Sequence, residues 1–484
     1  MGLSTTLINA ISGLNAAARG ADVVSSNVAN ARTPGFARRE LNLSAMTLGN
    51  TGAGVKIDGV SRSLNQFLLN DRRIADADAG NAGLRADFLA SAEGMVGRPG
   101  TPGALSDRLS ALSSALLQAA SRPDSQARLQ SVATAANSLT QKFAEVTKSL
   151  QNARMDADAK IDTLTKEMNT SLGQIDRLNA DILTERSSGR DATALMDQRQ
   201  RLVDRVAEIV PIREVARPHD QISLFTTGGT ILLEGNPATI GFAPVGIVTA
   251  DMTLASGALH GLTINGQPAL STDAGALGGG LLGAQLAIRD DLAPGIQTQI
   301  DALARDLIER FQAPGPDPTL APGQPGLFTD AGTSFNPLTE SGLAGRLRLN
   351  ALVDPAQGGA LWRLRDGLGA AAAGNVGNAT LLSALNDMLE AARVPASGGF
   401  IGAARSTAGL AADVLSQIAS DRLTGEGRVS FSTARQSTLT DLQLKDGVDT
   451  DTELQNLITI EHSYSANARV IKVVDELMQQ LIGL

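Results

Sequence analysis

The sequence contains no cysteine, and this absence removes several classes of site at once. Disulfides, thiolate metal sites and a cysteine nucleophile are excluded throughout the 484 residues. Aromatic residues are also scarce, at 3% of the chain with one Trp and one Tyr. Any apolar core must therefore be built from Leu, Ile, Val and Ala, whose compact side chains suit close packing between helices.

Positive charge is in short supply as well. Lys and Arg number 41 against 50 Asp and Glu, which gives a formal net charge of −9. Binding to nucleic acid needs a positive surface that displaces counterions, so we expect no nucleic-acid partner.

Long apolar runs are missing too. No stretch approaches the roughly 20 apolar residues of a membrane-spanning helix, so we expect no membrane insertion. Polar residues interrupt the apolar positions ahead of the first basic residue, Arg19, and a cleavable secretory signal is therefore not expected.

Both ends of the chain carry a narrow apolar stripe with helical spacing. Near the N-terminus, apolar residues follow alternating steps of four and three, the a/d pattern of a coiled coil. The stripe stops at Thr33-Pro34-Gly35, where Pro34 removes a backbone donor and Gly35 supplies a turn. Its members are Leu3, Leu7, Ala10, Leu14, Ala17, Ala21, Val24 and Val28.

The C-terminal stripe has the same spacing, and its helix is expected to begin near Asp449 or Asp451, either of which can cap a first turn. Its members are Leu457, Ile460, Tyr464, Asn467, Ile471, Val474, Met478 and Leu481. Asn467 is the polar member, a type that can fix register at some cost in stability. We expect the two stripes to pair as an antiparallel coiled coil. The alternative is two terminal helices on an ordinary core, although core helices usually show a wider apolar face.

A third helical region fills residues 104–210 and contains two runs with heptad spacing. The runs are Leu129, Val132, Ala136, Leu139, Phe143, Val146, Leu150 and Ala153, then Ile161, Leu164, Met168, Ser171, Ile175, Leu178 and Ile182. The skip between them predicts a stutter near Ala157. A helix of about 60 residues would be about 90 Å long, which predicts a rod-like module.

The remaining sequence alternates between β-prone and helical character. Residues 211–276 consist of short β-prone runs separated by Gly, Asn and Pro, a pattern typical of β-hairpins. A helix is expected to resume over 281–312, followed by a Pro/Gly-rich linker over 313–326. Strands could follow within 338–362, and Ala/Leu-rich helices return over 380–420.

The predicted fold is mainly α with an inserted β-rich domain, paired terminal helices and a long helical bundle between them. The first expected domain joins 1–60 with 440–484. The helical domain joins 61–210 with 281–330 and 380–439. The β-rich insert joins 211–280 with 331–379.

One glycine-rich stretch matches a pattern that is found in cofactor-binding loops. Gly278–Gly283 fits the G-x-G-x-x-G pattern of a dinucleotide-binding loop, which needs a buried strand just before it. Ser271–Leu277 do not read as such a strand. We therefore expect a close approach by a glycine-rich helix, and no cofactor.

The ionisable residues give no catalytic constellation. Asp290 and Asp291 are adjacent acids on an Ala/Leu-rich helix, and we expect them to be solvated, because acid–base or metal chemistry needs convergence in a shielded pocket. The histidines His219, His260 and His462 lack metal-ligand spacing, and His462 should be exposed beside the C-terminal stripe. We expect neither an enzyme nor a metal site.

Two terminal motifs resemble those of the flagellar rod/hook axial protein family. Residues 25–36 read SSNVANARTPGF, similar to S-x-N-[ILV]-A-N-x-x-T-x-G-[YF], with Phe36 where Tyr is commoner. Residues 464–471 read YSANARVI, similar to Y-x-A-N-A-x-x-I. Internal stretches resemble the hook-associated members of that family, with Gln200 in place of the usual acid. These stretches are 54–62, 67–73, 195–202 and 286–307.

The resemblance implies a structural subunit that leaves the cell through the flagellar type III export channel and joins hook to filament at the hook tip. It implies an inner tube of terminal helices, a middle layer of long helices and an outer β-rich insert. The terminal stripes, with Asn30 and Gly35, would carry axial assembly.

The same resemblance implies a set of partners. These are other copies of the chain, the hook protein, the second hook–filament junction protein and an export chaperone on the C-terminal helix. Two alternatives remain open. One is the hook protein itself or another rod or hook subunit; the other is a type III secreted effector or surface enzyme that borrows flagellar ends as an export signal.

Overall fold

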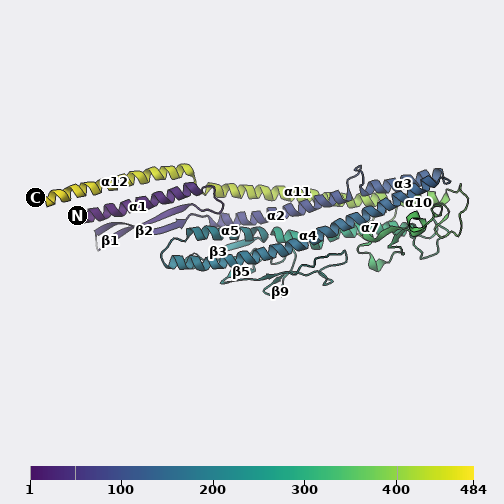
Figure 1. Ribbon diagram of the computed structural model, residues 1–484, viewed down its shortest axis with the longest axis horizontal. Coiled ribbons are helices and arrows are strands. Elements are labelled where there is room, and N and C mark those ends of the chain that lie inside the picture. Colours follow the sequence, from purple (N-terminus) through teal and green to yellow (C-terminus); the bar gives the residue numbers. More distant parts are fainter. Residues whose placement is uncertain (1, 49–50, 401, 484) are drawn as a thin grey trace.

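The computed structural model describes residues 2–48, 51–400 and 402–483, and it forms an elongated molecule whose two chain ends lie at the same tip (Figure 1). The longer helices are α1 (Leu3–Asn30), α2 (Gln66–Val96), α3 (Leu105–Ser121), α4 (Gln126–Ser187), α5 (Thr193–Ile209), α7 (Ala293–Gln312), α10 (Thr380–Glu390), α11 (Thr407–Lys445) and α12 (Thr450–Ile482). The shorter ones are α6 (Gly280–Ala287), α8 (Leu343–Arg346) and α9 (Arg363–Asp366), and a π-helical turn at Ile288–Leu292 links α6 to α7. The chain is thus mainly helical, as predicted.

The strands of the described residues form four small antiparallel sheets. They are β1 (Arg39–Leu48) with β2 (Thr51–Arg62), then β3 (Ile212–Ala216), β4 (Ile222–Thr226), β5 (Ile231–Glu234) and β6 (Asn236–Pro237), then β7 (Ile240–Gly241), β8 (Thr263–Ile264) and β9 (Gln267–Pro268), and last β10 (Phe328–Asp330) with β11 (Leu347–Leu349). In Figure 1 the strands after α5 lie along one side of α4.

The long helix expected within 104–210 is α4, whose 62 residues match the predicted length. Its inward residues include nearly all of the two predicted apolar runs. Near the predicted stutter, Arg154 takes the buried position, whereas Ala153 is only partly buried. A skip of four residues shifts which side chain faces inward, so the apolar stripe continues past this point through Ala157 and Ile161.

Two separate apolar cores line α4. The first contains α4 up to Ala157, together with residues from α3, α7, α10 and the segment 327–368. The second contains α4 from Ile161, together with residues from α5, β3 to β5 and α6.

The structure does not join the two ranges that we expected to share one β-rich insert. Residues 212–268 pack their strands in the second core, whereas β10 and β11 lie in the first core and in a sheet of their own. Phe328 in β10 meets Phe311 of α7 edge to face, with 5.3 Å between the ring centroids. This contact anchors the 327–349 segment to the helical body rather than to the other strands.

The helices expected over 380–420 differ in extent. α10 ends at Glu390, and α11 runs on to Lys445 alongside α2. Gly425 does not end α11; it lies inside the helix, where it faces Ala86 of α2. Beyond residue 420 almost every residue of α11 is at least partly exposed, so no apolar stripe marks this part of the helix in the sequence.

The glycine-rich stretch 278–283 makes a close approach, as predicted. Gly279 and Gly280 have positive φ angles of 85° and 58°. A Cβ atom on Gly280 would clash with the carbonyl oxygen of Ile209, where α5 ends. The glycines therefore let the start of α6 pass directly against the end of α5.

Asp301 of α7 is a buried carboxylate that holds α8. It accepts hydrogen bonds from the backbone N–H groups of Gly342 (2.7 Å) and Ala344 (2.8 Å) and from the Gln297 amide (2.9 Å). Burial raises the pKa of Asp301 to about 6, although these three hydrogen bonds oppose the rise.

A pH dependence follows from this shift. The folded pKa lies above the ordinary value, so the contribution of Asp301 to stability is present below about pH 4 and is lost as the pH rises through about 6. Two pKa units at 1.36 kcal/mol each make this loss as much as about 3 kcal/mol. We expect the free energy of unfolding of Asp301→Asn, measured in urea, not to show this pH-dependent loss. The wild type should therefore lose stability relative to the variant between pH 4 and 6.5. A difference that stays constant over this range would contradict the assignment.

Candidate functional site

The two termini form one unit, here called the terminal arm, which consists of α1, the β1–β2 hairpin and α12. α12 runs antiparallel to α1 (Figure 1), with Asn467 against Gly13 and Ile460 against Gly20. α1 also packs on the hairpin, where Ala53 and Val60 are buried. The apolar stripes give no prediction of this hairpin.

The predicted stripe residues are buried to very different degrees. Buried ones are Ala10, Ala17, Val24 and Val474. Partly buried ones are Leu3, Leu7, Leu14, Ala21, Ile460, Asn467 and Ile471. Exposed ones are Val28, Leu457, Tyr464, Met478 and Leu481. The structure thus brings both stripes together, but leaves much of the apolar surface of α12 open to solvent.

The polar stripe residue, Asn467, has a matching space on α1. A Cβ atom on Gly13 would lie 2.7 Å from Nδ2 of Asn467, so a larger residue at position 13 would displace that side chain. Asn467 also donates a hydrogen bond to the Ser463 carbonyl (3.0 Å). The helix itself begins as predicted, with Asp449 accepting a hydrogen bond from the N–H of Asp451 (3.0 Å), and His462 is exposed.

The motif over residues 25–36 forms the corner between α1 and β1. Asn27 is buried; it donates to the carbonyl of Arg39 and accepts from the N–H of Arg39, both at 2.9 Å. Asn30 makes local bonds instead, donating to the Ser26 carbonyl (3.0 Å) and accepting from the Thr33 hydroxyl (3.2 Å). The residue that links helix to strand is therefore Asn27, which an apolar-stripe criterion misses because it is polar.

Gly35 lets this corner rest on the helical body. Its φ is 79°, and a Cβ atom there would lie 2.5 Å from Cγ of Arg201 on α5. Next to it, the Arg39 guanidinium lies 4.9 Å from the centroid of the Phe36 ring. Gly35 is thus required both by backbone conformation and by space.

An ion-pair cluster joins the terminal arm to the body; we call it the joint. Asp197 on α5 is buried and lies 3.1 Å from Nη2 of Arg39 and 2.9 Å from Nε of Arg62, two partly buried residues that pair with each other at the open end of the hairpin. Arg62 also bonds to Gln200. Burial lowers the pKa of Arg62, and the carboxylate of Asp197 opposes that change. The two motifs at 25–36 and 195–202, far apart in sequence, therefore lie together.

A second ion pair lies within the terminal arm and joins the segment just before β1 to α12. Arg38 Nε lies 2.7 Å from Oε1 of Glu453, whose side chain is 1% exposed, in the first turn of α12. The hydrogen bond that Arg38 donates to the Glu453 carboxylate raises the pKa of Arg38, although burial opposes the rise. The start of α12 is therefore attached to the start of β1.

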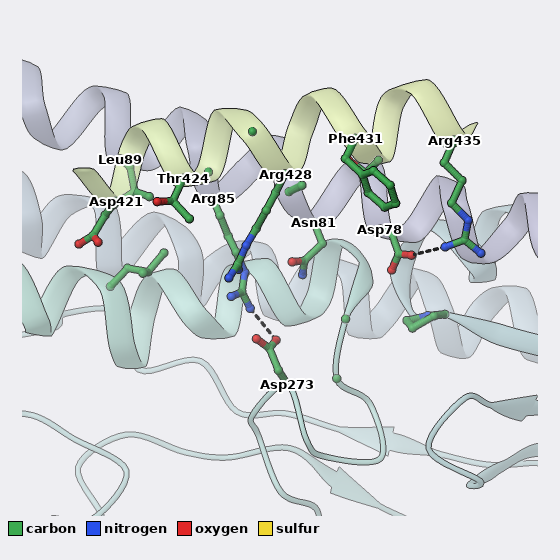
Figure 2. A pocket seen from close by; sticks show the side chains of 18 of the residues that line it. Asp78, Asn81, Arg85, Leu89, Asp273, Asp421, Thr424, Arg428, Phe431 and Arg435 are labelled. Carbon is green, nitrogen blue, oxygen red and sulfur yellow. Dashed lines mark hydrogen bonds and ion pairs between the residues drawn. The ribbon is translucent and has the colours of Figure 1, made fainter. Parts of the chain in front are cut away.

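A groove of about 820 Å³ lies away from the arm, between α2 and α11 (Figure 2). Ion pairs from Arg85 to Asp273 (2.5 Å) and from Arg435 to Asp78 (3.2 Å) cross it, while Arg428 and Phe431 lie along its edge. Two of its carboxylates, Asp78 and Asp273, are paired with arginines, and Asp421 accepts a hydrogen bond from the Gln417 amide at 3.0 Å. Over the described ranges, no group of His, Asp or Glu is arranged to hold a metal ion, and no helix has the length and apolar character to cross a membrane.

Three family models match the chain. The helical domain of flagellar hook-associated protein FlgK matches residues 89–315, the flagellar basal body rod FlgEFG protein C-terminal matches 445–484, and the flagella basal body rod protein matches 7–36. Together they cover more than half of the chain. The chain is similar to flagellar hook-associated proteins over much of its helical body and to flagellar rod proteins at its two ends. This confirms the resemblance drawn from the motifs.

Relatives of the chain differ in how much of it they match. Flagellar hook-associated protein 1 of Bacillus subtilis (strain 168) is 23% identical over 519 residues, covering 100% of this chain and 98% of that protein. The proteins of the same name from Salmonella typhimurium and Escherichia coli (strain K12) are 26% and 24% identical over 243 residues. Those matches cover 49% of this chain and 44% of each relative, so the chain matches less than half the length of these two.

Among solved structures, the flagellar hook junction protein FlgK from Burkholderia pseudomallei matches with a TM-score of 0.45 and 20% identity, over 54% of this chain and 46% of that one. The relatives found in the hook-associated protein 1 family are structural flagellar proteins rather than enzymes.

The ion pairs of the joint predict that removing the charge of Asp197 lowers the stability of the protein. Asp197→Asn would remove the carboxylate that pairs with the partly buried Arg39 and Arg62, and we expect it to destabilise the protein by about 2 kcal/mol in urea unfolding. Asp191→Asn is the matched control, because Asp191 is exposed and lies 3.8 Å from Arg19. Equal effects of the two substitutions would show that Asp197 does not hold the joint.

The contact between Gly13 and Asn467 predicts a second effect. Gly13→Leu should force α1 away from α12 and destabilise the arm by about 1–3 kcal/mol, measured by faster hydrogen exchange in α12. Adding Asn467→Ala should restore part of the loss. Gly83→Leu is the control, since a Cβ on this helical glycine of α2 meets nothing within 4 Å. No recovery in the double variant would argue against the contact.

Proposed function

We propose that this protein joins the flagellar hook to the filament, as a subunit of a tube that assembles at the hook tip. The observation that carries the proposal is the terminal arm, whose packed stripes leave an apolar surface on α12 uncovered. Exposed residues there include Leu454, Ile458, Leu477, Leu481 and Ile482. Exposed apolar residues of this kind on a helix that packs on one side are typical of an interaction surface.

A subunit of a tube uses heterologous contacts, in which one face of a copy meets a different face of the next. The arm would form the inner tube and carry the axial packing through both stripes, with Asn30 and Gly35 holding the corner. The helical body built on α2, α4 and α11 would form the next layer. The strands over 212–268 would lie outermost.

The proposed partners follow from this place in the tube. They are further copies of the chain, the hook protein on one side and the second hook–filament junction protein on the other. The chain would leave the cell unfolded through the type III export channel. An export chaperone would bind α12 over the surface that α1 covers in the folded arm, so that chaperone release and arm formation exclude each other.

The nearest rival is a hook or rod subunit. Cells that lack the protein should keep their hooks and shed filament subunits, whereas loss of the hooks themselves would favour the rival. Microscopy of a tagged copy should place it at the boundary between hook and filament.

The exposed surface of α12 can be tested without removing the helix. Leu477→Glu with Leu481→Glu places charge on that surface while leaving the packed side of the arm in place, and filament assembly and swimming should be lost. Leu338→Glu is the matched control, because Leu338 is an even more exposed leucine on the body.

A chain that ends at Leu454 should likewise be a soluble, helical monomer that no longer assembles. Hook tips that still carry either the double variant or the shortened chain would contradict the role of α12.

A further inference from the structure

The two cores of the body meet at one level of the molecule. On α4 the first core ends at Ala157 and the second begins at Ile161. On the neighbouring helix the second core ends at Leu286 and the first begins at Ile288. α4 contacts the π-helical turn at this level, so one boundary crosses both helices.

Charged side chains fill this boundary; we call Arg154, Asp158, Arg289 and Asp290 the ionic layer. Arg289 is fully buried and lies 2.7 Å from Asp158 and 2.8 Å from Asp290. Arg154 donates to the backbone carbonyl of Arg289 at 2.9 Å. The expectation that Asp290 would be solvated is therefore wrong, because its neighbour Arg289 points inward and holds it as an ion pair.

Both helices depart from the regular α-helical repeat at this level. The skip in α4 turns Arg154 inward, as described above. In the other helix, Pro294 has no N–H to give to the carbonyl of Asp290, and the N–H of Ala293 reaches back to Ile288 in the wider π pattern. These irregularities bring Arg154 and Arg289 to face each other.

Arg154 has donors left over, and they reach a loop of the β-rich region. The loop lies between β7 and β8. Its residues 243–261 are here called the strap, which leaves out Phe242 and Leu262 because both pack in the second core. Arg154 Nη1 donates to the carbonyl of Thr249 at 2.9 Å, and Nη2 donates to the carbonyl of Met252 at 2.6 Å. One buried guanidinium therefore binds the body and the strap together.

The rest of the ionic layer holds the strap at other points. Asp158 accepts a hydrogen bond from the N–H of Val245 at 2.7 Å. Arg289 donates to the carbonyl of His260 at 3.1 Å and lies 5.3 Å from the centroid of the Phe242 ring. The strap is thus held at its beginning, middle and end.

The strap has few other anchors on the body. It contains no helix or strand. Its buried apolar residues, Val248 and Leu259, belong to neither of the two cores. Its attachment therefore depends mainly on the ionic layer.

We infer that the ionic layer is a latch, from which the strap can detach without unfolding either core. The backbone groups on the strap can exchange their bonds for bonds to water, so the net strength of each bond is modest. The pair between Arg289 and Asp158 stays intact when the strap lifts, so the body does not lose its charge balance. Such an opening is a local unfolding event, separate from global unfolding.

Hydrogen exchange of the purified full-length monomer tests the latch. Arg154→Met keeps the length of the side chain but removes its donors. We expect amides of 243–261 to exchange at least tenfold faster, with those of 139–150 and 161–172 on α4 changing less than twofold. Arg154→Lys, which keeps the charge but cannot reach both carbonyls with a fork, should give an intermediate rate.

Arg205→Met is the matched control, because Arg205 also joins two helices of the body, through Glu167 (2.5 Å), and makes no hydrogen bond or ion pair with the strap. It should leave exchange in the strap unchanged. Unchanged exchange of the strap in Arg154→Met would overturn the latch. Exchange that becomes faster to the same extent in the strap and in both parts of α4 would also overturn the latch. The readout needs no assembly, so it is independent of the proposed function.

Discussion

The apolar stripe along α4 is the constraint on which the rest of the body depends. A helix of 62 residues presents about 90 Å of apolar surface that must be covered, and most helical stability comes from such packing. No other single segment covers the whole length. The chain covers one half with α3, α7 and the 327–368 segment, and the other half with α5, the strands after it and α6. Two cores result, because the covering segments change at the stutter.

Stability is distributed unevenly as a consequence. The body buries long rows of Leu, Ile and Val, whereas α12 fully buries only Glu453 and Val474. Small residues let α1 lie close to its neighbours, but small side chains bury little area each. The arm therefore depends on the joint for its orientation. Under the proposed function, contacts with other chains would supply further burial of α12, so that assembly would complete the folding of the arm.

The sequence predicted the parts of the fold that repeat. The stripes of α4 and of the two terminal helices follow from spacing alone, as does the close approach at Gly280. The hairpin over 39–62 could not be predicted in this way, because irregularities in the strand pairing between Asn42 and Leu43 and between Ala45 and Thr47 break the alternation of inward and outward residues. Likewise Asp197 owes its role to Arg39 and Arg62, which are far away in sequence, and Asn27 bonds Arg39 in the following strand; a lone polar residue carries no sign of such a partner. The family motifs marked the segments of the joint, but not the ion pairs between them.

Ion pairs between arginine and aspartate form the contacts at both boundaries between parts of this molecule. The arm meets the body through Asp197 with Arg39 and Arg62, and the two cores meet through Asp158 with Arg289. A continuous apolar contact at either boundary would be at least as stable, since desolvating charges offsets much of their attraction. Apolar contacts, however, tolerate several arrangements, whereas a guanidinium bound to a carboxylate and to specific carbonyls accepts only one. Arginines at these boundaries thus fix orientation while adding little cohesion, and the parts can separate at their boundaries before their cores unfold.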